Sequence, residues 1–153
     1  MTLSELLAPN LVLTKKACTS KDELIVMLVE HIYKTELPLP LSPKEMLKKI
    51  KIREEIGGTL FPSGLSVPHA RLPNYDGFIL ALGMPAEPIF HQGIKIRLMA
   101  LMITNQAGGL WYLPTLAYLT KLSRDTEYFS RLSGAENYDD VIEILRERNQ
   151  ELT

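Results

Sequence analysis

A run of six consecutive apolar residues, Leu98 to Ile103, restricts the possible folds of this chain more than any other segment. A strand covered on both faces shows such a continuous run. In a strand with one face exposed to solvent, apolar and polar residues alternate instead. Alternation does occur just before the run, at Ile94 and Ile96. The sequence therefore predicts a single strand over Ile94–Thr104, buried on both sides for most of its length.

Three further apolar stretches have strand character. Phe78–Met84 has turn residues on its N-terminal side and Pro85 on its C-terminal side. Leu11–Leu13 is a shorter candidate, and Leu65–Val67 is a weaker one because a serine interrupts it. These stretches predict the partners of the Ile94–Thr104 strand.

Five segments with helical spacing of apolar residues lie between and after the strands. Ser20 and Ser42 each precede a glutamate by three positions, which is the capping-box pattern that begins a helix. Gly134 is placed to cap the end of another helix. The helices are predicted from Ser20 to about Thr35, from Ser42 to about Glu55, from near Pro114, from about Asp125 to Leu132, and after Asn137.

Helices that alternate with fully apolar strands predict an α/β fold. We expect a single-domain layered sandwich, with a mixed, mostly parallel sheet and helices on both of its faces. A length of 153 residues fits one domain, and neither an internal repeat nor an interdomain linker interrupts the chain. Residues 1–153 are therefore predicted to form one unit.

Composition excludes several classes of function. With 17 Lys+Arg against 18 Asp+Glu, the chain lacks the basic excess that sequence-independent nucleic-acid binding needs. The lone Cys18 cannot form an internal disulfide, and three scattered histidines lack zinc-ligand spacing, so we expect no metal site. We see neither a signal peptide nor an apolar run of about 18 residues that could span a bilayer. These features predict a cytoplasmic chain that is not embedded in a membrane.

The segment from Lys51 to Arg71 is rich in glycine and proline without being a polar loop. Small residues let the backbone approach a ligand and point its N–H groups at an anion. In an extended stretch, His69 and Arg71 fall on the same side, and an imidazole beside a guanidinium suits an oxyanion or phosphoryl group. A structural loop with a hydrogen-bonded histidine is the competing interpretation, and these residues alone leave both open.

Two parts of this segment carry a family resemblance: Arg53–Thr59 (Arg-Glu-Glu-Ile-Gly-Gly-Thr) and Gly64–Arg71 (Gly-Leu-Ser-Val-Pro-His-Ala-Arg). They resemble the active segment of fructose/mannitol-type enzyme IIA domains of the phosphoenolpyruvate-dependent sugar phosphotransferase system. The nitrogen-regulatory enzyme IIA protein is a relative in that family. The order of helices and strands extends the resemblance over nearly the whole chain.

The resemblance implies a phosphotransferase component that works as a phosphoryl relay without a cofactor. His69 would accept the group from the histidine-containing carrier protein and pass it to a cysteine of an enzyme IIB partner, for sugar uptake. Arg53 matches the family arginine that helps hold the phosphoryl group, and Thr59 and the backbone near Gly64 are weaker candidates. Arg71 is added from its spacing to His69 rather than from the family pattern.

Two departures from the family pattern stand out. The family's second histidine corresponds to Tyr112, whose hydroxyl can hydrogen-bond a histidine or a phosphoryl oxygen but does not change charge near neutral pH. The Leu60–Ser63 stretch is bulkier than the Gly-rich family loop, and it is predicted either as an apolar docking rim or as buried. These departures keep a second hypothesis open, namely a regulatory protein-binding module of the nitrogen-regulatory kind, phosphorylation-dependent or phosphorylation-deficient.

An unrelated hydrolase or metal enzyme is disfavoured because the sequence shows no nucleophile–base–acid set and no metal cluster. His31 and Cys18 are assigned no functional role. The sequence leaves open the sugar, the phosphorylated imidazole nitrogen and whether the chain forms a homo-oligomer.

Overall fold

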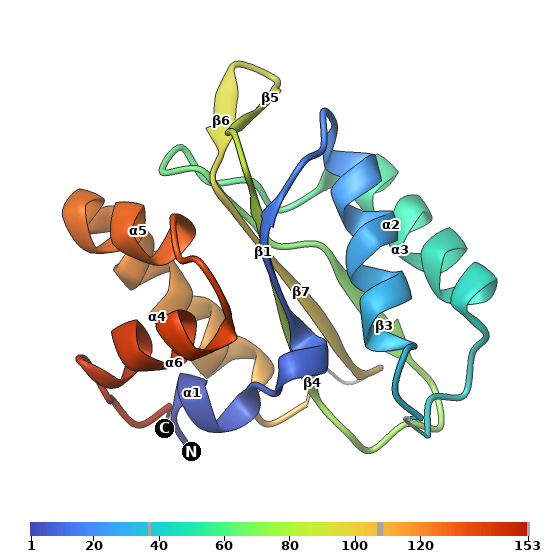
Figure 1. Ribbon diagram of the computed structural model, residues 1–153. Coiled ribbons are helices and arrows are strands. Elements are labelled where there is room, and N and C mark those ends of the chain that lie inside the picture. Colours follow the sequence, from blue (N-terminus) through green and yellow to red (C-terminus); the bar gives the residue numbers. More distant parts are fainter. Residues whose placement is uncertain (37, 107–108, 153) are drawn as a thin grey trace.

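A central sheet separates two layers of helices, as the computed structural model shows for residues 1–36, 38–106 and 109–152 (Figure 1). One face is covered by α2 (Lys21–Ile32) and α3 (Pro43–Gly57). The other face carries α1 (Leu3–Leu6), α4 (Tyr112–Arg124), α5 (Thr126–Ser133) and α6 (Tyr138–Arg146). The predicted single-domain α/β sandwich with helices on both faces is confirmed.

The main sheet has five strands, arranged around the predicted apolar run. That run forms β7 (Leu98–Asn105), which is buried from Leu98 to Thr104. It pairs antiparallel with β4 (Ile79–Pro85) and parallel with both β2 (Leu65–Ser66) and β3 (His69–Leu72). β1 (Val12–Lys16) adds a further parallel pairing, to β4. The sheet is therefore mixed and mostly parallel, as predicted.

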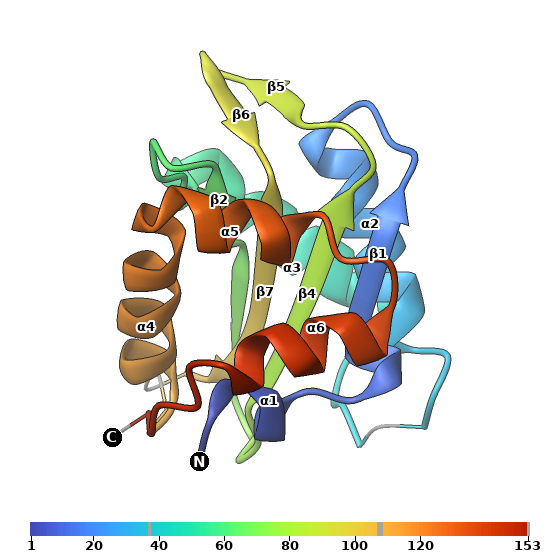
Figure 2. The ribbon, with the colours of Figure 1, turned by 60° about the vertical axis from the view of Figure 1, so that its left-hand side comes forward.

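The single strand predicted over Ile94–Thr104 is wrong, because the chain leaves one sheet and enters another at Arg97. Its first part, β6 (Ile94–Ile96), pairs antiparallel with β5 (Ile89–His91) in a separate hairpin that projects beyond the main sheet (Figure 2). The amide of Arg97 donates to the carbonyl of Gly64 at 2.8 Å, which fixes this corner. The alternating residues thus belong to the half-exposed hairpin, and the continuous run belongs to the covered strand.

The helices begin where their capping residues predict. Ser20 accepts a hydrogen bond from the Glu23 amide at 3.1 Å, and both halves of a capping box form between Ser42 and Glu45. α2 ends at Ile32, earlier than the predicted Thr35. A short 3-10 turn, Pro9–Leu11, lies before β1 and replaces the start of the predicted Leu11–Leu13 strand.

Gly64 closes the turn that leads into β2, and it has a conformation that only glycine adopts easily. Its φ is +100°, and a Cβ built there would lie 2.5 Å from the Lys95 carbonyl oxygen.

We expect Gly64→Ala to lower the free energy of unfolding by about 3 kcal/mol, measured by urea denaturation. Gly93→Ala is the matched control, since Gly93 has φ +80° but open space around it. Equal losses in both variants would show that the clash with Lys95 contributes nothing.

Candidate active site

His69 is the first residue of β3 and lies almost entirely inside the protein, with 3% of its surface exposed. The two residues before it are held by backbone hydrogen bonds: the Val67 amide donates to the Thr59 carbonyl at 2.8 Å, and the Met102 amide donates to the Pro68 carbonyl at 3.0 Å. The Nδ1 atom of the His69 ring is enclosed by the protein. This burial leaves the imidazole little room to turn.

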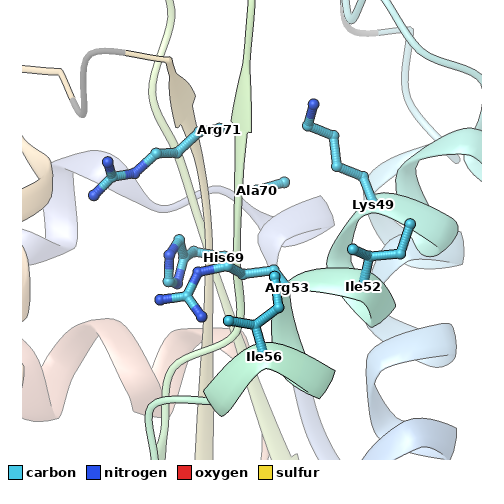
Figure 3. Close-up of a pocket in the computed structure, with 7 residues that line it drawn as sticks. All are labelled: Lys49, Ile52, Arg53, Ile56, His69, Ala70 and Arg71. Carbon is cyan, nitrogen blue, oxygen red and sulfur yellow. The ribbon is translucent and has the colours of Figure 1, made fainter.

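A cavity of about 300 Å³ opens between α3 and β3, with His69 in its wall (Figure 3). Its lining combines apolar side chains with the basic ones and includes no carboxylate. The lining residues are Lys49, Ile52, Arg53, Ile56, His69, Ala70 and Arg71. An anion that enters this cavity meets positive charge without a competing negative group in its wall.

Arg53 lies in the last part of α3, and its guanidinium points toward the His69 ring (Figure 3). Its Nη1 donates to the Gly57 carbonyl at 2.8 Å, one helical turn further on, which limits where the guanidinium can lie. The neighbouring Glu54 does not neutralise this charge, because its carboxylate pairs with Lys21 at 3.0 Å. Both side chains of that pair are nearly buried, with 12% and 7% exposed. Arg53 therefore keeps its positive charge for the cavity.

Tyr112 contacts both His69 and Arg71. Arg71 lies two residues after His69 on β3, and its guanidinium carbon is 5.5 Å from the centre of the Tyr112 ring. The His69 and Tyr112 ring centres are also 5.5 Å apart, at an interplanar angle of 55°. The prediction that His69 and Arg71 share one side of an extended strand is consistent with these contacts.

The environment of His69 favours its neutral form. Burial is the main cause that lowers the pKa of His69 below its ordinary value, and the Arg53 and Arg71 guanidinium groups act in the same direction. The Val67 backbone and the Glu54 carboxylate act against this shift but do not reverse it. A neutral imidazole carries the lone pair that a nucleophile needs.

We expect the His69 ring to titrate below the ordinary histidine value of about 6.5, as followed by histidine NMR signals against pH. Arg53→Gln removes a positive charge near the ring, so it should move this titration upward, toward the ordinary value. The same shift makes the free energy of unfolding depend on pH. Since the pKa of His69 is lower in the folded than in the unfolded protein, the free energy of unfolding decreases as pH falls from about 6.5 toward the folded pKa. A wild-type titration above the ordinary value would contradict the role of burial.

The other predicted phosphoryl-binding residues, Thr59 and Gly64, are not among the described residues that line the cavity. Thr59 is half-buried, and its carbonyl anchors the strand segment that leads to His69. Gly64 packs against Lys95, and its N–H donates to the Phe61 carbonyl at 2.9 Å, so it shapes the turn rather than the cavity. In the predicted docking rim, Leu60 and Phe61 are partly buried against the core, and Pro62 is exposed.

Sequence reasoning missed the α3 wall of the cavity. Ile52 and Ile56 are 50% and 77% exposed, and they line the cavity together with Lys49 and Arg53. These four positions follow the spacing i, i+3, i+4 and i+7, which places them on one helix face. That spacing could have indicated the wall in advance, because it places two apolar and two basic residues along one side of the helix.

Over residues 1–36, 38–106 and 109–152, no group of three or more His, Cys, Asp or Glu side chains is arranged to hold a metal ion. None of the helices in the same part of the chain is long and apolar enough to cross a bilayer.

Comparison with known families gives a match over residues 5–148, which include every residue of the site. The matching family is described as the phosphoenolpyruvate-dependent sugar phosphotransferase system, EIIA 2. The chain belongs to this family. Proteins of the EIIA 2 family are phosphotransferase components, and the buried histidine beside basic groups lies within the matched region.

Individual relatives of this EIIA 2 chain are distant in sequence. A nitrogen regulatory protein from Bradyrhizobium diazoefficiens is 23% identical over 148 residues, covering 95% of each chain. The crystal structure of nitrogen regulatory protein IIA-Ntr from Neisseria meningitidis is similar with a TM-score of 0.74 at 19% identity, covering 94% of this chain and 98% of that one. A complex of enzyme IIAMTL and phosphorylated enzyme IIBMTL from Escherichia coli gives a TM-score of 0.70 at 18% identity, covering 93% and 98%. At these identities the structural similarity establishes the fold.

Proposed function

We propose that residues 1–153 form one phosphocarrier domain, which accepts a phosphoryl group on His69 and passes it to a protein cysteine for sugar uptake. One observation carries the proposal: the buried imidazole of His69, whose pKa is lowered by burial, lines a cavity together with Arg53 and Arg71, and the described residues of the lining include no carboxylate. A positioned nucleophile, with positive charge that stabilises the transferring group, is what a protein contributes to in-line phosphoryl transfer.

In the first step, the lone pair of the His69 imidazole attacks the phosphorus of a phosphohistidine on the histidine-containing carrier protein. A new P–N bond forms as the donor's P–N bond breaks, and the electron pair of the broken bond stays on the donor imidazole. In the second step, a cysteine thiolate of an enzyme IIB partner attacks the same phosphorus, and the electron pair of the His69 bond returns to the ring. Neither step consumes water, a metal ion or a cofactor.

We assign the phosphoryl group to Nε2 of His69. The Nδ1 atom is enclosed in the structure, so an incoming phosphorus has no open path to its lone pair. We therefore expect the attack to come from Nε2, and a fixed position of the attacking atom contributes much of the rate in relay reactions.

The proposed partners meet a surface with both apolar and basic character. Ile52 and Ile56 are the exposed apolar residues on the α3 side of the cavity, and Leu110 and Leu113 are exposed beside Tyr112. Exposed apolar side chains around a charged centre are typical of transient protein interfaces. The structurally similar enzyme IIAMTL is described in a complex with phosphorylated enzyme IIBMTL, which supports a IIB partner for this chain. Such a relay operates in the cytoplasm.

The test is to incubate the chain with phosphoenolpyruvate, enzyme I and the carrier protein, and to look for an adduct that acid cleaves and alkali does not. Phosphorus and nitrogen NMR of the labelled protein should place the group on Nε2 of the His69 ring. Absence of label under conditions that charge a known family member would refute the carrier function. Label on Nδ1 would refute only the assignment of the nitrogen.

A regulatory protein-binding function is a second candidate, and one comparison favours it. The nitrogen regulatory protein matches end to end, over 95% of both chains. In that case the phosphoryl group on His69 would switch partner binding instead of moving on to sugar. Mixing the phosphorylated chain with enzyme IIB separates the two candidates: loss of label to the IIB cysteine supports transport, and label retained on His69 supports regulation.

A further inference from the structure

We propose that Tyr112 is a positioning residue that holds the Arg71 guanidinium against its ring face, so that Arg71 contacts the phosphoryl group on His69. This inference rests on the proposed phosphocarrier function and specifies how one part of that site is built. The side chains of Arg71, Tyr112 and His69 are called the clamp below.

The clamp joins two elements that are far apart in the sequence. Arg71 and His69 come from β3, whereas Tyr112 is the first residue of α4. Tyr112 is 7% exposed, so its ring has little freedom to turn away. The ring lies 5.5 Å from the Arg71 guanidinium and, on centres, 5.5 Å from the His69 imidazole. One fixed aromatic side chain therefore contacts both the nucleophile and a cation.

Arg71 needs such a partner because it is itself exposed. A free arginine side chain samples many rotamers, and its charge reaches a given point only part of the time. Among the ion pairs of the described residues, none involves Arg71. A guanidinium over an aromatic face is attracted by the ring and keeps its N–H donors free at the edge. The clamp thus restricts Arg71 without neutralising it.

The ring face of Tyr112, rather than its hydroxyl, makes these contacts. No hydrogen bond of the Tyr112 hydroxyl occurs in the described hydrogen-bond set, while both ring contacts do. The aromatic face is therefore the part of the side chain that contacts Arg71 and His69 in the unphosphorylated protein. Phenylalanine provides the same face, so it should replace tyrosine at this position without loss.

The positive charge of Arg71 also acts on the His69 imidazole. Arg71 contributes to the lowering of the pKa of His69, together with the stronger effect of Arg53. Since the Arg71 guanidinium and the His69 ring contact the same Tyr112 ring, a phosphoryl group on that imidazole would lie in the neighbourhood of the guanidinium. Arg53 and Arg71 then approach the group from α3 and from the α4 side.

The experiment measures the rate of phosphoryl uptake from the phosphorylated carrier protein in four variants. Arg71→Gln should slow uptake roughly tenfold, which is the loss of one charge-assisted contact. Tyr112→Met, which keeps volume but loses the ring, should cause a similar roughly tenfold loss, and Tyr112→Phe should stay within about twofold of wild type. The double variant Tyr112→Met/Arg71→Gln should be no slower than the single variants, because both act through the same guanidinium.

A spectroscopic measurement gives an independent readout in the unphosphorylated protein. The side-chain proton resonances of Arg71 should be shifted upfield by the Tyr112 ring in wild type and in Tyr112→Phe, and this shift should disappear in Tyr112→Met. Arg146→Gln is the matched control, since Arg146 is an exposed arginine on α6 and should leave both rate and shift unchanged. Thermal unfolding of each variant checks that the fold is intact.

Several outcomes overturn the clamp. Arg71→Gln with wild-type uptake would remove Arg71 from the site, and this exposed position gives a folded variant even if Tyr112→Met does not fold. Tyr112→Phe as slow as Tyr112→Met would assign the role to the hydroxyl. Multiplied losses in the double variant would make the two residues independent. A wild-type chain that takes up no label refutes the relay itself, and the Arg71 resonances still report whether the contact exists.

Discussion

Replacement of His69 by glutamine is expected to lower phosphoryl uptake by more than about 10³-fold, leaving no acid-labile adduct. Glutamine fills similar space and retains polar atoms, but it has no lone pair that can attack phosphorus at neutral pH. His69 is buried at the start of β3, so the variant removes the nucleophile while the surrounding backbone bonds stay in place. Quantification of labelled protein with phosphoenolpyruvate, enzyme I and the carrier protein measures the effect.

The other two histidines supply the controls for this result. His31 lies in α2 with its Nε2 2.9 Å from the Pro9 carbonyl, and His91 ends β5 in the projecting hairpin. His31→Gln and His91→Gln should take up label at the wild-type rate. Undiminished label on His69→Gln would refute the site assignment. Loss of label in His91→Gln would show that phosphoryl uptake depends on the β5–β6 hairpin.

The second large effect is expected at Arg53. Arg53→Gln should slow phosphoryl uptake roughly 10²-fold, because the guanidinium that points toward His69 stabilises charge on the transferring group. The same variant raises the fraction of protonated His69, which reduces the neutral nucleophile further as pH falls. Rates measured at several pH values separate these contributions: the electrostatic loss persists at high pH, and the protonation loss does not.

Lys51→Gln is the matched control for Arg53. Lys51 lies on the same helix and carries the same charge, but it lines a different depression beside Val26 rather than the His69 cavity. Its replacement should leave uptake unchanged. A loss in Lys51→Gln equal to that in Arg53→Gln would mean that uptake depends on the overall charge of α3 and not on one placed guanidinium.

Local sequence patterns predicted most of the elements, because helix caps and apolar runs are short-range signals. Ser42 and Glu45 start α3 where the capping box requires, and Leu98–Ile103 form the core of β7. The prediction failed where two adjacent patterns belonged to different sheets, since strand alternation at Ile94 and Ile96 says nothing about the partner strand. The sequence did not predict β3 as a strand, because its four residues include an exposed arginine and form no apolar run. Its strand structure depends on pairing with β7, which is distant in the sequence.

The site was predicted in part for the same reason. Alternation along an extended chain placed His69 and Arg71 together, and family resemblance supplied Arg53. The α3 stripe of Ile52 and Ile56 was missed because exposed apolar residues become meaningful only once a neighbouring strand defines a cavity. The family resemblance pointed to Tyr112 and to the hydrogen-bonding capacity of its hydroxyl, but the contact of its ring with Arg71 depends on how α4 lies beside β3 and has no signal in the sequence.

The buried pair of Lys21 and Glu54 couples positions that look unrelated in the sequence. Loss of Lys21 leaves a carboxylate in the protein interior without its counter-ion, next to Arg53 in the chain, and that carboxylate opposes the positive potential at the His69 cavity. A substitution of Lys21, in the first turn of α2, is therefore expected to change the electrostatic potential at the His69 cavity although Lys21 is not among the residues that line it. The ion pair thus links the charge carried by α2 to a site whose wall is formed by α3 and β3.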